Sequence, residues 1–405
     1  MKNSLLLIAL FLLTQCHNGG KKELENSDKR AEFFEINYEK ILKNKKPINL
    51  SDIASDVRYI PFETGNKHLI SRKPQYYFSE NLIFVGNYDH ILVYDYSGKF
   101  IRQIGTPGRG PGEIDLIRII SVIEKEQFII IQTNWSRKLM YFSFDGKFIK
   151  SIPVPMDVFK IHVLNMDQRL LYYSCSQGFE DYLYVLTNKN WDTISTINNH
   201  YKWTNNTGLT GMIGYDSFKP FYKYHNQIFF KSMYNDTVYT VADNKIKPTY
   251  FINLGKYLLP NELRPEPPQS ALRFRSENDK YFYVSVMEAG DMIFVTTENY
   301  KANINKNMLF DSNSSEGIFL VNKSNEPSGI INDWDSGMEF WPEGNVNDNE
   351  IFMTISSLTL KNMLKEGDFS KATARFPEKK QALKEMIDKL NETDNPVLML
   401  VKLKM

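Results

Sequence analysis

A loop rich in glycine and proline offers the first residues that could do chemistry. It reads Gly-Thr-Pro-Gly-Arg-Gly-Pro-Gly-Glu over residues 105–113 and contains Gly108, Arg109, Gly110, Gly112 and Glu113. Bare glycine N–H groups can cradle a phosphate, and an arginine fork suits a carboxylate or phosphate. No Gly-Lys-Ser/Thr follows, and a strand-like run comes next instead of a helix. Two hypotheses stand: a structural crossing between strands with Glu113 capping loop N–H groups, or a ligand loop with Arg109 as donor.

A second candidate segment combines carboxylates with indole rings. It contains Asp333, Trp334, Asp335, Glu339, Trp341 and Glu343. Acids beside aromatic rings could hold a cation or stack on a sugar. Aspartates in turns more commonly accept hydrogen bonds from the turn backbone, and a tryptophan can pack in the interior. The structural interpretation is favoured, with a ligand loop as the alternative.

The residue patterns give little support for a metal site or for nucleic-acid binding. None of the six histidines forms His-x-His or His-Glu-x-x-His, which disfavours a catalytic metal site on one segment. Carboxylates brought together from separate strands could still bind Ca²⁺, so a divalent ion is the one cofactor left open. The chain has 49 basic and 48 acidic residues, a net charge of +1, which predicts no nucleic-acid partner.

The N-terminus has the pattern of an export signal. Lys2 is followed by an apolar run over residues 5–13, which is too short to span a bilayer. The run ends at Leu-Thr-Gln-Cys16, which resembles the lipobox of bacterial lipoproteins, where the cysteine becomes lipidated. We predict a lipoprotein signal peptide over 1–16, a flexible polar tether over 17–46, and an exported protein anchored in the outer membrane, facing the periplasm or the surface. The alternative is an ordinary signal peptide with a chance cysteine.

Two near-copies in the chain set the predicted fold. Residues 91–105 and 139–153 share the pattern of two strands around Ser/Asp-Gly-Lys-Phe-Ile, with Gly98 and Gly146 at matching positions. Such a hairpin repeating every ~40–50 residues is typical of a propeller blade. Strand-like runs continue to the C-terminus, including one at 329–332, and they make five clear units plus a sixth that is split between the two ends of the chain.

We therefore predict an all-β, six-bladed β-propeller over residues 47–405. Its last blade is expected to close when the strand at 397–403 pairs with 57–62 or with a strand near Ile48, because closure removes exposed sheet edges. Residues 372–390 contain few β-branched residues and place apolar side chains at helical spacing, so a short helix is expected within this last blade. Its apolar stripe is expected to pack on the propeller.

Three motifs, in this order, resemble a known family. They are the Gly-x-Gly-Pro-Gly-Glu stretch at 108–113, Asp-Trp-Asp-Ser-Gly-Met-Glu-Phe-Trp-Pro at 333–342 and the closing run at 394–404. Together with 51–63, they resemble the NHL-like six-bladed β-propeller lipoproteins of Gram-negative bacteria. The resemblance covers about residues 48–404 and implies the propeller fold and a lipid anchor, but no agreed activity.

Two classes of function follow from this fold. The first is a binding or scaffold module of the cell envelope for a protein, peptide or glycan, which predicts a broad face of exposed aromatic side chains. The second is a metal-dependent propeller hydrolase or lyase, which predicts carboxylates converging beside an apolar pocket at the central channel. A purely structural partner of an outer-membrane transport complex is a third possibility. No catalytic residue can be named from the sequence.

Overall fold

The computed structural model describes most of the chain from Phe33 onward. The described residues are 33–155, 158–174, 178–202, 211–212, 219–233, 235–263, 265–266, 280–299, 305–366 and 368–404. The predicted signal peptide, Cys16 and the first half of the predicted tether lie outside this range. Among the described residues, no helix combines the length and the apolar character needed to cross a membrane.

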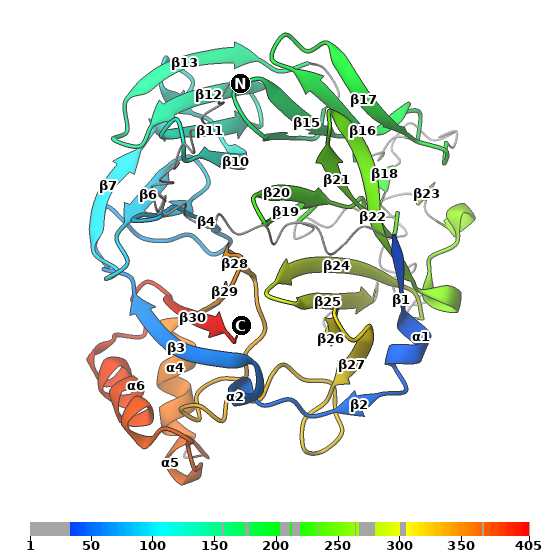
Figure 1. Cartoon of the computed structure of the whole chain (residues 1–405). Coiled ribbons are helices and arrows are strands. Elements are labelled where there is room, and N and C mark those ends of the chain that lie inside the picture. The colour runs from blue at the N-terminus through cyan, green and yellow to red at the C-terminus, as the bar shows by residue number, and fades with distance from the viewer. Residues whose placement is uncertain are drawn as a thin grey trace, which may run out of the picture. The chain divides into compact units, whose positions relative to one another are not determined.

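Six sheets arranged around a common axis form the propeller (Figure 1). Blade 1 contains β4 (Gln75–Phe78), β5 (Ile83–Gly86), β6 (Ile91–Tyr94) and β7 (Phe100–Ile104). Blade 2 contains β10 (Ile117–Ile123), β11 (Phe128–Thr133), β12 (Lys138–Ser143) and β13 (Phe148–Pro153). Blade 3 contains β14 (Lys160–Val163), β15 (Gln168–Tyr172), β16 (Tyr182–Asn188) and β17 (Thr193–Asn198). In each, the strands lie in chain order from the axis outward and pair antiparallel.

Blades 4 to 6 each recruit a strand from the N-terminal part of the chain. Blade 4 contains β19 (Phe221–Tyr224), β20 (Gln227–Phe230), β21 (Thr237–Ala242), β22 (Lys245–Asn253) and, outermost, β1 (Phe34–Asn37). Blade 5 contains β24 (Phe282–Ala289), β25 (Met292–Asn299), β26 (Asn305–Asp311), β27 (Glu316–Leu320) and, outermost, β2 (Lys45–Lys46). Blade 6 contains β28 (Gly344–Asn347), β29 (Glu350–Ile355), β30 (Val397–Leu403) and, outermost, β3 (Ala54–Pro61).

The predicted six-bladed fold with terminal closure is confirmed. β30 lies between β29 and β3, so the ring closes on the strand predicted near 57–62 rather than on one near Ile48. The middle strands are continuous apolar runs, such as Ile-Leu-Val-Tyr in β6, because neighbouring blades bury both of their faces. The strand predicted at 329–332 is wrong: Ile330 and Ile331 form only isolated bridges, to Phe340 and Asn49.

An N-terminal strap runs along the outer edge of three blades, where part of a flexible tether was expected. We define the strap as residues 33–46; it contains β1, α1 (Tyr38–Ile41) and β2, and α2 (Leu50–Ile53) then leads into β3. β1 pairs parallel with β22, and β2 pairs parallel with β27. The difference from the predicted tether has a plain cause. Ile36, Tyr38 and Ile41 are spaced to bury their side chains between blades 4 and 5.

Helices interrupt the last blade between β29 and β30. The predicted helix at 372–390 is observed as α6 (Pro377–Lys389), with Leu383 and Ile387 buried against the propeller. Two further helices precede it, α4 (Ser357–Lys365) and α5 (Asp368–Lys371). The short remaining elements are β8 (Thr106–Pro107) paired with β9 (Glu113–Ile114), β18 (Gly211–Met212) paired with β23 (Pro265–Glu266), and the 3-10 turns η1 (Gly255–Tyr257) and η2 (Asn261–Leu263).

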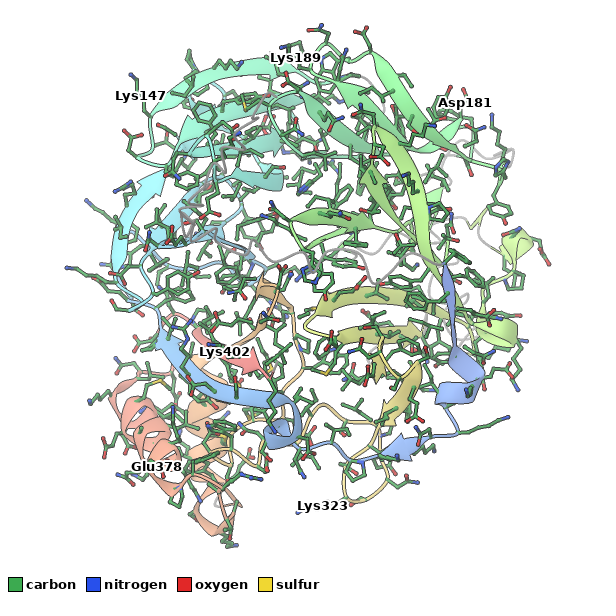
Figure 2. All side chains as sticks on the ribbon, in the orientation of Figure 1. Lys147, Asp181, Lys189, Lys323, Glu378 and Lys402 are labelled. Atoms are coloured by element: carbon green, nitrogen blue, oxygen red, sulfur yellow. The ribbon has the colours of Figure 1, made fainter. Side chains whose placement is uncertain are left out.

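The two ends of the blades form faces of different character. We call the end where the chain passes from one blade to the next the crossover face; the connections between each blade's second and third strands lie there too. The opposite end, the turn face, carries tight hairpin turns such as His225-Asn226 and Asp243-Asn244, whose positive φ angles suit two-residue turns. Charged side chains, including Lys147, Lys189 and Glu378, project at the periphery (Figure 2).

Candidate functional site

The glycine-rich loop connects blade 1 to blade 2 on the crossover face. Its ends pair as the parallel strands β8 and β9, and Gly108 N donates to Ile114 O at 3.1 Å. The Glu113 carboxylate accepts a hydrogen bond from Gly110 N at 2.8 Å, which is the capping role expected in a structural crossing. The loop backbone is therefore folded around Glu113. Arg109 projects from it as an exposed side chain with no partner among the residues that the structure describes.

Replacing Gly108 by alanine is expected to disrupt this loop locally. Gly108 has φ +148°, and a Cβ there would lie 2.0 Å from Glu113 Oε2, so the cap must open. We expect a loss of about 1–3 kcal/mol in unfolding free energy and faster amide exchange over 105–116. Pro107→Ala, on the exposed face of the same loop, serves as the control. Unchanged exchange in Gly108→Ala would contradict the proposed role of the cap.

The acidic and aromatic segment at 333–343 lies between α2 and the helical insertion. Asp333 accepts hydrogen bonds from Ser51 N at 2.9 Å and Ser51 Oγ at 2.6 Å, while its backbone oxygen accepts from Arg375 N. Trp334 is buried, and its ring centroid lies 4.4 Å from that of Phe376. These contacts fasten two separate segments to the propeller.

The side chains of Asp335 and Trp341 likewise form hydrogen bonds with other residues of the propeller. Asp335 is 1% exposed and accepts hydrogen bonds from Asn332 Nδ2 at 2.8 Å and Gly337 N at 2.9 Å. Burial raises the pKa of Asp335, although these hydrogen bonds and one from Tyr59 oppose the shift. Trp341 Nε1 donates to Thr296 Oγ1 at 2.8 Å. The geometry therefore favours the structural interpretation of this segment, and the structure does not bring it together with the glycine-rich loop.

The central channel is crossed by contacts between blades 4 and 6. β19 and β28 touch across the axis: Lys219 Nζ donates to Glu343 O at 2.7 Å, Asn345 Nδ2 donates to Lys223 O, and His225 N donates to Asp348 Oδ1 at 2.7 Å. These bonds join the innermost strands of two blades that are not neighbours in the ring.

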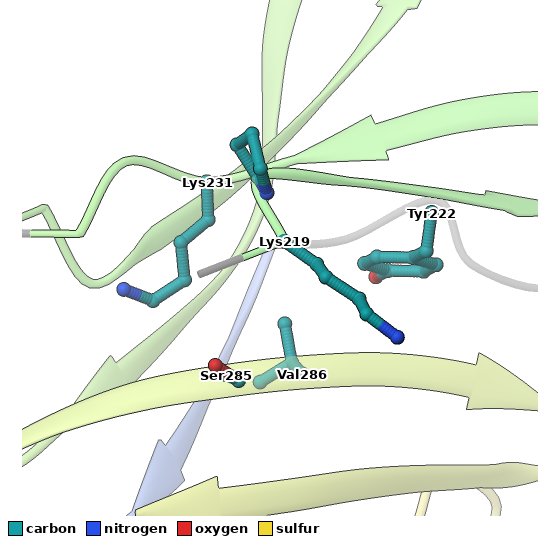
Figure 3. A pocket seen from close by; sticks show the side chains of 6 residues that line it. Lys219, Tyr222, Lys231, Ser285 and Val286 are labelled. Carbon is teal, nitrogen blue, oxygen red and sulfur yellow. The ribbon is translucent and has the colours of Figure 1, made fainter. Parts of the chain in front are cut away.

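A small hollow lies beside these contacts, lined by Lys219, Pro220, Tyr222, Lys231, Ser285 and Val286 (Figure 3). Its empty space is about 180 Å³ with open solvent included, below the range of roughly 300–1,000 Å³ typical of ligand pockets. Lys231 is engaged with Asp236 at 3.3 Å, and Tyr222 donates to Glu288 at 2.7 Å. Among the described residues, no three His, Cys, Asp or Glu side chains are grouped to hold a metal ion.

His162 in the channel wall is expected to make stability fall in acid. It lies on β14 with its ring 5.3 Å from that of Phe221. Burial, with a smaller contribution from Lys223, lowers its pKa from 6.5 to about 4. The unfolded state therefore takes up a proton first, and stability declines as pH falls from about 6.5 to 4, by roughly 3 kcal/mol.

Chemical denaturation at pH 7.5 and pH 4 measures this decline. His162→Gln should show a smaller difference in unfolding free energy between the two pH values than the unsubstituted protein. The exposed His200→Gln controls for loss of a histidine at the surface. An equal pH difference in His162→Gln and the unsubstituted protein would exclude this histidine as the cause.

Four connections of blades 1 and 2 are joined into one layer at the crossover face. We call this layer the loop platform; it comprises residues 62–74, 87–90, 105–116 and 134–137. Buried Asn87 accepts from Ser71 N at 3.0 Å and donates to Leu69 O at 2.9 Å. Ile117 N, which directly follows the third connection, donates to Tyr88 O at 2.6 Å.

Asp115 completes the joining of the platform. Its carboxylate accepts from Ser136 N at 2.6 Å, and Asn134 N donates to Leu116 O at 2.9 Å. Hydrogen bonds involving the backbone thus join 62–74 to 87–90 and 105–116 to 134–137, and the bond from Ile117 N joins 87–90 to the start of β10. The layer is preorganised, so a ligand binding there would have little loop-ordering entropy to overcome.

Large apolar side chains are exposed mainly on this face. Leu69 is 52% exposed, Tyr88 54% and Trp135 67%, all on the loop platform. Phe179, Tyr182, Tyr201, Leu258 and Leu358 lie in other connections or strand ends at the crossover face. Eight of the twelve such exposed side chains in the described part of the chain thus lie at the crossover face; the other four are Phe33, Ile101, Ile149 and Ile194, near the turn-face ends of outer strands. A concentration of exposed apolar side chains on one face is typical of an interaction surface.

Sequence reasoning found only one part of this arrangement. It selected the loop carrying Arg109 but missed Leu69, Tyr88 and Trp135, because no sequence motif marks a single exposed apolar side chain. Their strand–loop context was readable, since each follows a predicted strand at the same end of a blade. What the sequence could not show was that Asn87 and Asp115 join separate connections and that Ile117 N bonds Tyr88 O between blades 1 and 2.

Sequence and geometry together define the class of this protein as a six-bladed β-propeller with most of its large exposed apolar side chains on one face. The chain belongs to the family described as a domain of unknown function, DUF4934, whose model matches residues 33–402. No curated protein matches the chain.

Solved structures resemble the chain in fold. A candidate exported protein of Bacteroides fragilis NCTC 9343 has a TM-score of 0.67 at 19% identity, covering 92% of this chain and 100% of that one. A member of the duf4221 family from Bacteroides vulgatus ATCC 8482 has a TM-score of 0.46 at 10% identity, covering 87% and 97%. A streptogramin B lyase has a TM-score of 0.37 at 13% identity, covering 73% and 80%. Only the first likeness is strong enough to support the fold.

Proposed function

We propose that this protein is a non-enzymatic binding module that recognises a partner in the cell envelope through its crossover face. The observation that carries the proposal is the one-sided exposure of Leu69, Tyr88 and Trp135 on loops fixed by hydrogen bonds. A face of exposed aromatic side chains is what a binding module requires, whereas a soluble surface without a partner rarely gathers them.

Export of the chain belongs to the same proposal. The apolar run before Cys16 supports it, as does the strong fold similarity to a candidate exported protein. We propose that Cys16 is lipidated and holds the propeller at the outer membrane. Labelling growing cells with an alkyne fatty acid tests this: label on the full chain and none on Cys16→Ser is expected, and equal labelling of both would exclude it.

Photocrosslinking tests the binding role. The full chain carries p-benzoylphenylalanine in place of Trp135, with the exposed turn-face residue Lys147 substituted in the same way as a control. We expect a discrete crosslinked product in envelope membranes from position 135, competed by excess unlabelled protein, and none from position 147. No product at 135, or the same products at both positions, would overturn the proposed binding face.

The metal-dependent hydrolase or lyase remains the alternative, and a melting experiment separates it from the binding module. The channel contacts and the internally engaged Asp335 and Glu288 leave no converging carboxylates in the described part of the chain. We therefore expect the thermal midpoint to change little after EDTA, and no stoichiometric divalent ion in the purified protein. A large drop after EDTA, restored by Ca²⁺, would favour the alternative.

A further inference from the structure

The basic and the acidic side chains of the loop platform differ in whether they have partners within the protein. Its basic side chains Lys67, Arg72, Lys73 and Arg109 are all exposed and have no hydrogen bond or ion pair within the described residues. Arg137, the fifth basic residue of the platform, is not part of this set. Three of these cations share the 62–74 connection with Leu69, and Arg109 lies on the 105–116 connection; Tyr88 and Trp135 lie on the other two connections of the same platform. They are free to bond with an incoming group.

The acidic side chains of the platform are each engaged already. Glu63 accepts from Phe100 N at 3.0 Å, and Asp89 lies 2.7 Å from His90 Nδ1. Glu113 holds Gly110 N, and Asp115 holds Ser136 N. A cationic ligand would have to compete with these internal contacts, whereas an anionic ligand finds donors that are unoccupied. The preference for an anionic ligand comes from these available donors and not from the net charge of the platform, which is small.

Resting on the binding role proposed above, we infer that the loop platform docks an acidic segment of a protein partner that carries apolar or aromatic residues among its carboxylates. Tryptophan, tyrosine and arginine are the residues enriched at the centres of protein–protein interfaces, and Trp135, Tyr88 and Arg109 supply all three. Arginine forks bind carboxylates in two-pronged geometry, and the rings take the apolar side chains between them.

A random copolymer of glutamate and tyrosine is the probe for this inference. Its binding to the full chain is followed by fluorescence anisotropy at low and high salt. The platform variant carries Lys67, Arg72, Lys73 and Arg109 changed to alanine. The control variant changes Lys99, Lys125, Lys147 and Lys245, which are exposed at the turn face, so that both variants lose the same charge. Trp135→Ala tests the apolar part.

We expect the platform variant to bind the copolymer at least tenfold more weakly and the control variant to bind within about twofold of the unsubstituted protein. Trp135→Ala should also weaken binding. If the platform and control variants behave alike while Trp135→Ala weakens binding, the acidic partner is wrong and the binding face stands. If Trp135→Ala also has no effect, both proposals fail.

Two further probes decide the kind of anionic partner. Polygalacturonate and phosphatidylglycerol vesicles carry negative charge without a polypeptide. We expect both to bind more weakly than the copolymer and to be insensitive to Trp135→Ala. Equal or tighter binding of either one, lost in the platform variant, overturns a protein partner in favour of an acidic glycan or a lipid surface. Absence of copolymer binding to the unsubstituted protein also overturns the inference.

Discussion

Deleting the N-terminal strap, residues 33–46, is expected to lower the unfolding free energy by roughly 5 kcal/mol or more. Ile36, Tyr38 and Ile41 are each at most 4% exposed and pack into the core shared by blades 4 and 5. Burying one such side chain contributes about 1.5–3 kcal/mol, and deletion also uncovers the edges of β22 and β27. A flexible tether over the same residues could be removed at almost no cost.

Chemical denaturation of the deletion variant distinguishes strap from tether. Tyr38→Ala provides a milder test, since it removes a ring whose hydroxyl lies 3.2 Å from Thr297 Oγ1 and which packs on Tyr257. We expect a loss of about 3–5 kcal/mol for Tyr38→Ala. Lys40→Ala, exposed in the same helix, should change stability by less than about 0.5 kcal/mol. Equal stability of the deletion variant and the full chain would exclude a stabilising role for the strap.

Replacing Asn395 by alanine is expected to cost about 3–5 kcal/mol. This side chain is 3% exposed and sits just before the closing strand β30. Its amide accepts from Ile70 N at 2.8 Å and donates to Glu63 O at 2.8 Å and to His68 O at 2.9 Å. Alanine leaves Ile70 N and Glu63 O without these partners, while His68 O keeps only its hydrogen bond from Tyr94 Oη at 3.0 Å; each group left unsatisfied costs about 1–3 kcal/mol.

The Asn395 variant also tests how the last blade is joined to the first. The control is Asn391→Ala, an exposed asparagine in the same connection, which should be near neutral. Amide exchange should accelerate over residues 62–74, the platform connection that Asn395 holds. A variant as stable as the control, with unchanged exchange there, would show that the three hydrogen bonds contribute little.

The blade pattern could be predicted because it is local. Apolar runs such as Ile91–Tyr94 are bounded by turns whose glycines recur at a fixed interval, so each hairpin is readable by itself. The helix at 377–389 was readable for the same reason. The strap was not, because Phe34–Asn37 is four residues long and gains its strand form only from β22, more than two hundred residues away.

The candidate site was predicted in part for a related reason. The glycines at 108, 110 and 112 indicate an unusual backbone conformation. The role of Glu113 as the cap of this loop could be predicted from the sequence of the loop alone. The acids at 333 and 335 looked equally available in the sequence. The partner of Asp333 is Ser51, which lies 282 residues away in the sequence and is brought near by closure of the ring, and Asp335 is buried with the nearby Asn332 as its partner. Sequence reveals which side chains could bind, and tertiary contacts decide which remain free to do so.

The direction of β1 determines how the propeller is presented to its surroundings. β1 runs parallel to β22, and β22 runs from the turn face toward the crossover face. β1 therefore also runs toward the crossover face, and Phe33, which precedes it, lies at the turn-face end of blade 4. A linker attached at Phe33 would therefore leave Tyr88 and Trp135, which lie on the crossover face, at the opposite end of the propeller and accessible to a partner approaching from that side.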